Sequence, residues 1–344
     1  MGISIRDIAK LAGVSPTTVS FVINNKKGVS EETRERVRRI IKENGYSEKM
    51  SVARHKSVGR RICIVKYSID KASAMDNSEL DSYLISCLHS ICSKKQIIVS
   101  MTMCNADNFQ TTMKNIIHER YSGVIIIGTL LEDEQIRFLD SMDLAEESII
   151  VIDNDMRNTC VNSVGTSNRE ISHIAVQYLH SLGFDSIGYL HSNVPISKCR
   201  ARARGFDEIM AQLNIQNEVR IPLRPTLDGA YNDMLYWMNH GFQQPKAFYV
   251  DTGIIALGAM RAMQERGIRI PEDVSIIAGD DMLLGMFSMP SLTAVSTSYK
   301  SICKIALTLI ERKNSEAFKQ NNAEHISIVG KLVIRNSAGK NSQP

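Results

Sequence analysis

The stretch VSPTTVSFVINN, residues 14–25, has the pattern of a short helix with a well-defined start. Ser15 can cap the helix with its hydroxyl, and Pro16 suits the first helical position, where a missing N–H group costs nothing. No side chain in the stretch is charged, and Phe21 lies in its middle. The neighbouring segments decide how such an uncharged helix can be used.

Two further helical patterns flank this stretch. In SIRDIAKLAG, residues 4–13, Ser4 is a suitable N-cap, a glycine ends the helix, and the expected apolar stripe is Ile5, Ile8, Ala9 and Leu11. In GVSEETRERVRRIIKENGY, residues 28–46, the N-cap is Ser30, and the expected core face is Val37, Ile40 and Ile41. A helix, a short turn that contains glycine and a second capped helix form the helix-turn-helix pattern.

The two sides of the middle helix differ in chemistry. Three apolar residues fall on one side and are expected to pack on the flanking helices: Val19, Val22 and Ile23. The other side carries Thr17, Ser20, Phe21 and Asn24. In a helix-turn-helix protein the second helix presents its outer residues to base edges in the major groove, where Thr can hydrogen-bond and a Phe ring can contact thymine methyl groups.

Charge is distributed unevenly along the chain. Residues 1–61 contain 14 Lys and Arg against 6 Asp and Glu, whereas the remaining residues carry a small negative excess. A basic head on a slightly acidic body indicates a module that binds a polyanion, although a solvated charged surface is the alternative that composition leaves open.

The segment IRDIAKLAGVSPTTVSFVINNKKGVSEETRERVRRIIKENGY resembles the DNA-binding head of the LacI–GalR repressors along its whole length. The usual family segment is VSxxTVSRVLN, so Phe21 stands where an Arg normally contacts the operator. The resemblance implies base contacts by Pro16, Thr17 and Phe21 and a phosphate contact by Asn24. The DNA-binding surface that it implies comprises Ser4, Arg6, Ser15, Pro16, Thr17, Thr18, Ser20, Phe21, Asn24 and Arg54.

The segment after the head departs from the family pattern. The family usually continues with xPNxxARxL, a hinge that forms a short helix on DNA and inserts its Leu into the minor groove. This chain has SEKMSVARHKSVGRR, which keeps Ala53-Arg54 but has no Pro-Asn and places His55 or Lys56 at the wedge position. A basic residue cannot open a base step as an apolar wedge does. We therefore expect a head at residues 1–46 and a hinge at 47–60 that contacts DNA through Arg54 and bends it weakly.

From residue 61 onward, short apolar runs alternate with helix-like segments. Seven runs have the length and β-branched composition of strands: RICIVKY, QIIVSMTM, GVIIIGT, SIIVIDN, SIGYLHS, KAFYV and VSIIAGDD. Their spacing predicts βαβ units and parallel sheets. Ligands of such sheets bind beyond the carboxyl ends of the strands, where the chain places Asp153, Asp251, Asp280 and Asp281.

Sequence motifs for other functions are missing. No G-x-G-x-x-G follows a strand, and no phosphate-binding loop, nucleophile elbow or H-E-x-x-H occurs. The adjacent carboxyl groups of Asp280 and Asp281 could hold a metal, but such pairs at strand ends more often accept hydrogen bonds. We therefore expect no cofactor, no metal and no catalytic residue.

The body also resembles the LacI–GalR effector domain, which is similar to periplasmic sugar-binding proteins. CRARARGFDEIM, ALGAMRAMQERGIRIPEDVSIIAGDD and PSLTAVSTS are the specific stretches. The resemblance implies an α/β domain of two lobes joined by three crossovers, with a ligand cleft between them. It implies lobes at 61–164 plus 294–325 and at 165–293 plus 326–337, followed by a polar tail at 338–344.

Within this domain the resemblance implies effector contacts by particular residues. Arg202 matches the ligand-clamping Arg of the RxxGF motif, and its guanidinium suits vicinal hydroxyls or a carboxylate. Asp153 and Asp280 match carboxylates near the ligand. The usual Asn-Asp pair is Thr252-Gly253 here, with Asp251 just before it, and PLRPTLDGA has no aromatic residue to stack on a sugar ring. The effector could therefore differ from a plain hexose.

Features of the whole chain exclude several classes of protein. The seven cysteines are odd in number and scattered without a C-x-x-C pair, which argues against a disulfide framework or a zinc site. No apolar run is long enough to span a membrane, and the first residues lack the apolar stretch of a secretory signal. We expect a cytoplasmic protein with no membrane partner.

These observations predict a transcriptional regulator, a repressor of carbohydrate-related genes. It would bind a pseudo-palindromic operator as a homodimer and be switched by a sugar or sugar derivative in the cleft. One alternative is a solute-binding protein for transport, which the basic head opposes. A second is a sugar-acting enzyme that uses Asp153 and Asp280 as a carboxylate pair.

The residue at position 21 yields a direct test of base recognition. Phe21→Arg should move the preferred operator base from thymine to guanine, because Arg bonds the guanine edge whereas Phe contacts the thymine methyl. Selection of binding sites from a random DNA pool with both proteins measures this preference. An unchanged selected base would contradict the prediction.

Overall fold

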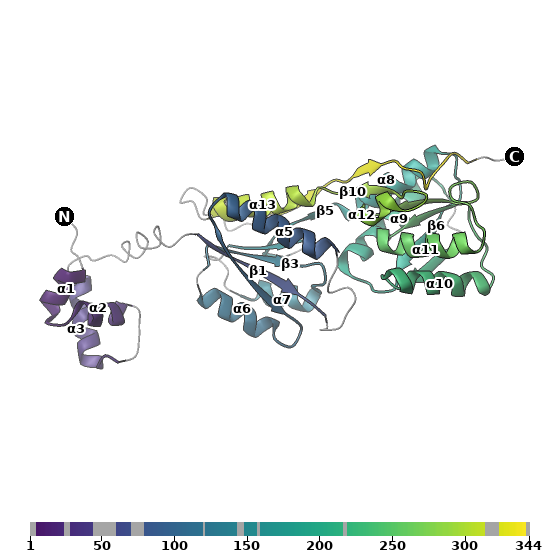
Figure 1. Ribbon diagram of the computed structural model, residues 1–344. Coiled ribbons are helices and arrows are strands. Elements are labelled where there is room, and N and C mark those ends of the chain that lie inside the picture. The colour runs from purple at the N-terminus through teal and green to yellow at the C-terminus, as the bar shows by residue number, and fades with distance from the viewer. Residues whose placement is uncertain are drawn as a thin grey trace. The chain divides into compact units, whose positions relative to one another are not determined.

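The computed structural model describes residues 5–23, 28–43, 60–69, 79–119, 121–142, 148–156, 159–215, 219–313 and 323–341. The chain forms two compact units, Met1–Arg60 and Arg61–Pro344, and each unit has its own hydrophobic core. Figure 1 shows the three helices of the first unit in purple and the α/β body in blue to yellow. Three predicted DNA-contacting residues, Ser4, Asn24 and Arg54, lie outside the described residues.

The first unit is a bundle of three helices, α1 (Ile5–Ala12), α2 (Pro16–Ile23) and α3 (Glu31–Glu43). The caps predicted at Ser15 and Ser30 are present, because the Ser15 hydroxyl accepts a hydrogen bond from the N–H of Thr18 at 3.0 Å and Ser30 starts α3 in the same way. The turn between α1 and α2 passes through a glycine with φ of +62°, a left-handed conformation that favours glycine.

The core of this unit differs from the predicted one at two positions. It is built from Ile8, Ala9, Ala12, Val19, Val22 and Val37. Leu11, which the sequence placed on the apolar stripe, is 57% exposed, and Ala12 takes the buried position next to it. Arg34, expected on the outer face of α3, is buried and its Nε lies 3.6 Å from a carboxylate oxygen of Glu31.

In the second unit, the first lobe is built on a parallel sheet. Within the described residues it has six strands, in the order β11 (His325–Ile328), β5 (Asn162–Thr166), β4 (Ile149–Ile152), β3 (Gly123–Ile127), β1 (Arg61–Tyr67) and β2 (Ile98–Cys104). Its helices are α5 (Glu79–Lys94), α6 (Phe109–His118), α7 (Asp133–Asp140) and α13 (Tyr299–Lys313). Alternate strand residues face opposite layers, so that Cys63 packs with α6 and α7 whereas Ile62 packs with α5 and α13. Figure 1 shows these two pairs of helices on the two sides of the sheet.

The second lobe repeats this plan. Its sheet, in the part of the chain that is described, has the order β12 (Lys331–Val333), β10 (Thr293–Ser296), β9 (Ser275–Ala278), β8 (Ala247–Val250), β6 (Gly188–Ser192) and β7 (Arg220–Leu223). Its helices are α8 (Asn168–Ser181), α9 (Ser197–Gln212), α10 (Leu227–Asn239), α11 (Gly253–Glu265) and the short α12 (Leu283–Phe287). β12 pairs antiparallel with β10, and the other pairs are parallel. The predicted α/β fold of two lobes with parallel sheets is confirmed.

The chain passes between the lobes three times, between β5 and α8, between β10 and α13, and between β11 and β12. The boundaries expected from the sequence, at 164/165, 293/294 and 325/326, come a few residues too early. β5 continues through Thr166 in the first sheet, β10 pairs with β9 in the second sheet, and β11 pairs with β5 in the first. Hydrogen bonding in the sheets therefore moves each crossing toward the C-terminus.

Within the described ranges, none of the helices combines the length and the apolar character needed to cross a membrane.

Candidate functional site

The outer face of α2 is the candidate surface for contacting bases. Val19 and Val22 are buried against the other two helices, so the opposite side of α2 is turned away from the core. Thr17 on that side is exposed and Phe21 is half-buried. The side chains of Arg6 and Ser20, two further predicted contacts, lie outside the described residues.

The start of α2 is held by a small network of hydroxyl groups. The Oγ of Ser15 and the Oγ1 of Thr18 lie 2.9 Å apart, and the same Ser15 oxygen accepts the N–H bond that caps the helix. Ser15 therefore positions the first turn of α2, in which Pro16 and Thr17 are exposed. These exposed residues are where a base edge could approach.

A cavity of about 760 Å³ lies between the two lobes of the body. The second lobe contributes the first turn of α9, the starts of α10 and α11, and residues 280–286, whereas the first lobe contributes α5 and the segment after β3. Of the residues predicted to contact the effector, Thr252 and Asp280 line this cavity. Arg202, Asp251 and Asp153 are not in its lining, because they are buried behind it.

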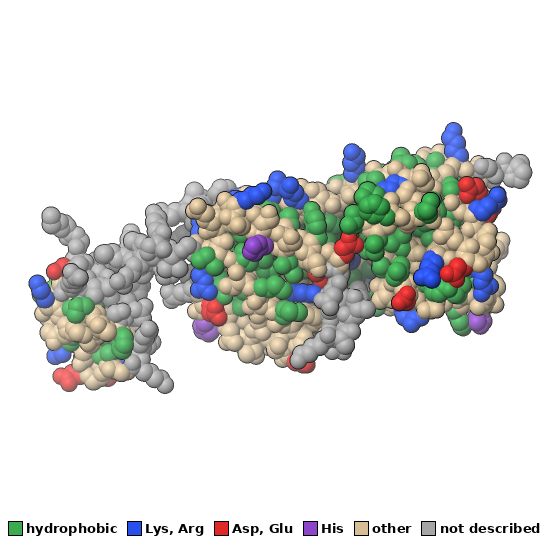
Figure 2. All heavy atoms as spheres, viewed as in Figure 1, with side chains coloured by type: hydrophobic (Ala, Val, Ile, Leu, Met, Phe, Trp, Pro, Cys, Tyr) green, Lys and Arg blue, Asp and Glu red, His purple; other side chains and the backbone are tan. Residues whose placement is uncertain are grey.

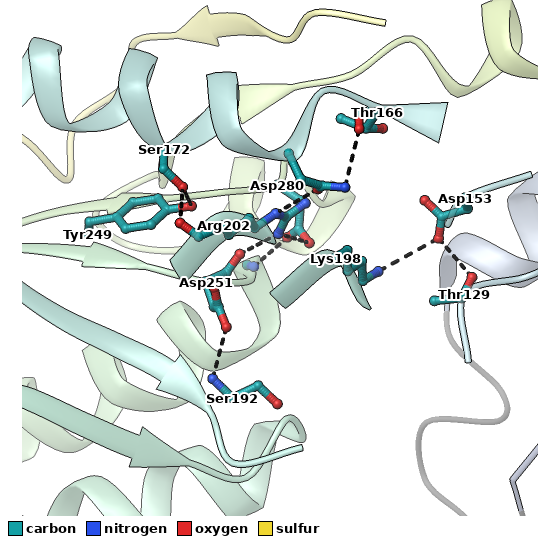
Figure 3. A network of polar contacts seen from close by, with 12 residues as sticks. Thr129, Asp153, Thr166, Ser172, Ser192, Lys198, Arg202, Tyr249, Asp251 and Asp280 are labelled. Carbon is teal, nitrogen blue, oxygen red and sulfur yellow. Dashed lines mark hydrogen bonds and ion pairs between the residues drawn. The ribbon is translucent and has the colours of Figure 1, made fainter. Parts of the chain in front are cut away.

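Arg202 organises the floor of the cavity. Its side chain is 1% exposed, and its Nε donates a hydrogen bond to Oδ1 of Asn168 at 3.1 Å. One terminal nitrogen donates to the backbone carbonyl of Asp251 and lies 3.4 Å from Oδ2 of Asp280 (Figure 3). Burial lowers the pKa of the guanidinium, but Asp280 together with the nearby Tyr249, Tyr299 and Cys199 outweighs this effect, so its pKa is raised. Arg202 therefore remains charged and holds Asp280 at the cavity wall.

A close approach of α8 and α9 makes this arrangement possible. Gly205 lies one turn after Arg202, and a Cβ atom at this position would be 2.6 Å from the carbonyl oxygen of Arg169 on α8. A glycine here lets α9 pack closely against α8, so that Arg202 reaches Asn168. The glycine of the RxxGF motif thus has a packing role that serves the arginine.

Asp251 is occupied by interactions within the second lobe. Its carboxylate accepts hydrogen bonds from the Tyr189 hydroxyl at 2.6 Å and from the N–H of Ser192 at 3.0 Å. Burial raises the pKa of the Asp251 carboxyl, although the bonds from Tyr189 and Ser192 and the charge of Arg202 oppose this rise. With both oxygens bonded and 1% of the residue exposed, Asp251 is a residue that positions the strand ends of the site.

Asp153 takes part in a bridge between the lobes. It follows β4 of the first lobe, has a φ of +57°, and accepts a hydrogen bond from the Thr129 hydroxyl at 2.7 Å. The same oxygen lies 3.8 Å from Nζ of Lys198 on α9 of the second lobe (Figure 3). Next to this pair, the Ser197 hydroxyl donates to Asn154 and accepts from the N–H of Asp155. The first turn of α9 is thus attached to the first lobe.

Several cavity residues escaped the sequence prediction. Tyr83 on α5 and Tyr299 on α13 line the cavity, and their rings meet edge to face with centroids 6.5 Å apart. Asp81 also lines it and pairs with the buried Lys66 at 3.3 Å. Both tyrosines come from helices, whereas the prediction considered strand ends and the segment before α10, so no local signal pointed to them.

The lining combines polar and apolar side chains, in part from the same segments. Ile254, Leu283, Leu284 and Met286 supply an apolar wall, whereas Lys198, Thr252 and Asp280 supply hydrogen-bonding groups. A mostly apolar cleft with a few oriented polar groups is typical of a site for a small ligand. Within the described residues, no group of three or more His, Cys, Asp or Glu side chains could hold a metal ion.

Family profiles match both units of the chain. The profile of bacterial regulatory proteins of the lacI family matches residues 4–48, and the profile of the periplasmic binding protein-like domain matches residues 176–338. The chain is 28% identical to the HTH-type transcriptional repressor PurR of Haemophilus influenzae (strain PittEE), which covers 97% of this chain and 98% of that protein. The PurR repressor of Mannheimia succiniciproducens is also 28% identical, over 98% of this chain and 99% of the relative.

Solved structures share the fold over nearly the whole length. The lac repressor dimer bound to operator and the anti-inducer ONPF has a TM-score of 0.70 at 23% identity and covers 98% of this chain and 100% of that one. A complex of the transcriptional regulator CelR with cellobiose has a TM-score of 0.67 at 20% identity, with 97% and 99% covered. A regulator from Enterococcus faecium with bound ribose has a TM-score of 0.65 at 20% identity and covers 81% of this chain and 99% of that one.

Replacing Asp251 tests its positioning role. Asp251→Ala leaves the Tyr189 hydroxyl and the Ser192 N–H buried without their acceptor, so the free energy of unfolding should fall by about 2–4 kcal/mol. Urea unfolding followed by fluorescence of Trp237, the single tryptophan, reports on the second lobe. The exposed control Glu272→Ala should change the free energy by less than about 0.5 kcal/mol. Equal effects of both substitutions would contradict this role.

Proposed function

Because the chain is a LacI-family transcriptional repressor, which binds DNA and is switched by a ligand, we propose that it represses carbohydrate-related genes in response to a sugar or sugar derivative. The observation that carries this proposal is the pairing of a helix-turn-helix unit with a two-lobe body whose cleft is lined by oriented polar groups. The first unit supplies DNA recognition and the second supplies the ligand response.

DNA recognition in this proposal separates affinity from base selection. Lys10, Arg36 and Arg39 are exposed and lie outside α2, at positions from which they can contact phosphates. The uncharged outer face of α2 then contacts base edges through Pro16, Thr17 and Phe21, with phosphate contacts by Asn24 and the hinge residue Arg54. This assignment follows the family pattern and the exposure of Thr17.

The effector would bind in the 760 Å³ cavity. Asp280 offers a carboxylate fixed by Arg202 and by the N–H of Gly253, and Thr252 offers a hydroxyl at the start of α11. Fixed acceptors of this kind suit the hydroxyl groups of a sugar. The solved relatives that hold cellobiose and ribose indicate the compounds with which a search for the effector should begin.

We propose that the protein acts as a homodimer. Two apolar surfaces are exposed on the body, namely Met101 and Met103 on one face of the edge strand β2, and Phe287 and Met289 at the C-terminal end of α12. Phe287 is 73% exposed and Met289 is 85% exposed, and Figure 2 shows hydrophobic side chains gathered over α12. Exposed apolar patches of this kind mark interaction surfaces, and paired heads are what a pseudo-palindromic site requires.

A gel-shift experiment tests the regulatory function. The full chain should select a pseudo-palindromic site from genomic fragments at physiological salt, and deletion of residues 1–58 should abolish this complex. The same deletion should leave ligand-induced stabilisation intact, because the body has its own core. A thermal-shift screen of sugars and sugar phosphates, followed by a gel-shift with each hit, identifies the effector. Failure to form any sequence-specific complex would end the proposal.

The dimer surface has a separate test. Phe287→Asp combined with Met289→Asp places two charges on the exposed patch and should convert the protein to a monomer in sedimentation analysis, with a loss of operator affinity. Tyr236→Asp is the matched control, because Tyr236 is an exposed aromatic residue on α10 outside both patches. A double variant that remains dimeric would exclude this surface.

A further inference from the structure

Of the two partly buried cations that line the cavity, Lys198 and Arg335, Lys198 has the weaker bonding to its neighbours, whereas Lys300 of the lining is exposed. Lys198 is the second residue of α9, lines the cavity, and its side chain is 12% exposed. Its Nζ lies 3.8 Å from Oδ2 of Asp153, which is beyond hydrogen-bonding distance, and that oxygen already accepts a bond from Thr129. Among the described residues, the ammonium group donates no hydrogen bond, although it has three N–H donors to offer.

Thr252 supplies a second unused donor in the same cavity. The residue is 9% exposed, precedes α11 as its N-cap, and lines the cavity. Within the described residues its Oγ1 has no hydrogen-bond partner, which is unfavourable for a buried hydroxyl. A ligand oxygen that bonds to this hydroxyl would remove the penalty.

The two donors lie on adjacent elements. Arg202, one turn after Lys198 on α9, donates a hydrogen bond to the backbone carbonyl of Asp251, the residue before Thr252. The first turn of α9 and the start of α11 are therefore side by side at the strand ends. Thr226 and Leu227, at the start of α10, also line the cavity, so three helices begin at it with their partly positive ends.

Three carboxylates of the cavity wall lie closer to their cationic partners than Asp153 lies to Lys198. Asp281 lies 2.8 Å from Arg335, and Asp81 lies 3.3 Å from Lys66. Asp280 is held by Arg202 and by the N–H of Gly253. These pairs offset the charges of these three carboxylates, whereas Glu79 is a further, exposed carboxylate of the lining. Lys198 keeps hydrogen-bonding capacity that a ligand can use.

We propose that Lys198, with Thr252, makes the cleft selective for an effector that carries a carboxylate or phosphate group, such as a sugar acid or a sugar phosphate. The inference rests on the proposed function and specifies the chemical class of its effector. Charged oxygens form stronger hydrogen bonds with an ammonium group than neutral hydroxyls do. The apolar wall of Ile254 and Leu283 would contact the rest of the ligand.

Paired probes test this selectivity. Glucose, galactose and ribose are each compared with the corresponding sugar phosphate, and the two hexoses also with their uronic acids, by thermal shift of the full chain at matched ionic strength. At least one anionic probe should stabilise the protein more than its neutral partner, and calorimetry then gives its Kd. The phosphate and uronic acid arms show which anionic group the cleft prefers.

Variants of Lys198 assign the selectivity to this side chain. Lys198→Met should weaken binding of the anionic probe about tenfold or more, whereas Lys198→Arg should retain most of its affinity because the charge is kept. Lys304→Met is the matched control, because it removes the same charge from an exposed position on α13 outside the cavity. Thermal unfolding without ligand shows whether each variant is folded.

Three outcomes would overturn the inference. The first is that no anionic probe stabilises the protein more than its neutral partner, which includes the absence of any thermal shift. The second is a preference for the anionic probe that persists in folded Lys198→Met. The third is an equal loss of affinity for the anionic probe in Lys198→Met and Lys304→Met. The gel-shift of the ligand-free full chain separates these results from failure of the proposed function. If a neutral sugar releases the full chain from DNA in the gel-shift, the proposed regulatory function stands and the anionic effector is rejected.

Discussion

The second lobe depends on the burial of one charged side chain. A guanidinium taken out of water must be hydrogen-bonded and paired with a negative charge, or the cost of burial exceeds the packing energy that the site gains. Arg202 meets this requirement with acceptors from three elements: Asn168 on α8, the carbonyl of Asp251 after β8, and Asp280 after β9. The charge therefore fixes the relative positions of two strand ends and two helices, and these are the elements that form one wall of the cavity.

This constraint separates positioning from contact in the cleft. Asp251 and Arg202 lie behind the wall, whereas Asp280 and Thr252 reach its surface. A buried network in which each group is bonded holds the exposed groups in one arrangement before any ligand arrives. The order of affinity among ligands is then determined by the few polar groups at the surface, while the network behind them keeps their geometry constant.

How much the sequence predicts differs between the fold and the site. All seven apolar runs that were expected to be strands contain one, but five strands of the described residues were missed: β5, β7, β10, β11 and β12. They are only three to five residues long, and polar residues or a proline interrupt their apolar pattern. Arg202 and Asp280 could be predicted because they follow specific motifs. Lys198, Tyr83 and Tyr299 could not, since they reach the cavity from helices whose facing sides are brought together only by the packed lobes.

Helix α9 connects the ligand site with the arrangement of the lobes. Its first turn is attached to the first lobe through Ser197 and the charge pair of Lys198 and Asp153, and its next turn carries Arg202 in the second lobe. A ligand that bonds to Lys198 competes with Asp153 for the same ammonium group, so it acts directly on a contact between the lobes. A ligand shifts a conformational equilibrium only through contacts that differ between the two states. The ion pair with Asp153 joins the two lobes and would change if the lobes rearranged, so the N-terminus of α9 is a place where binding energy could be converted into a change of lobe arrangement.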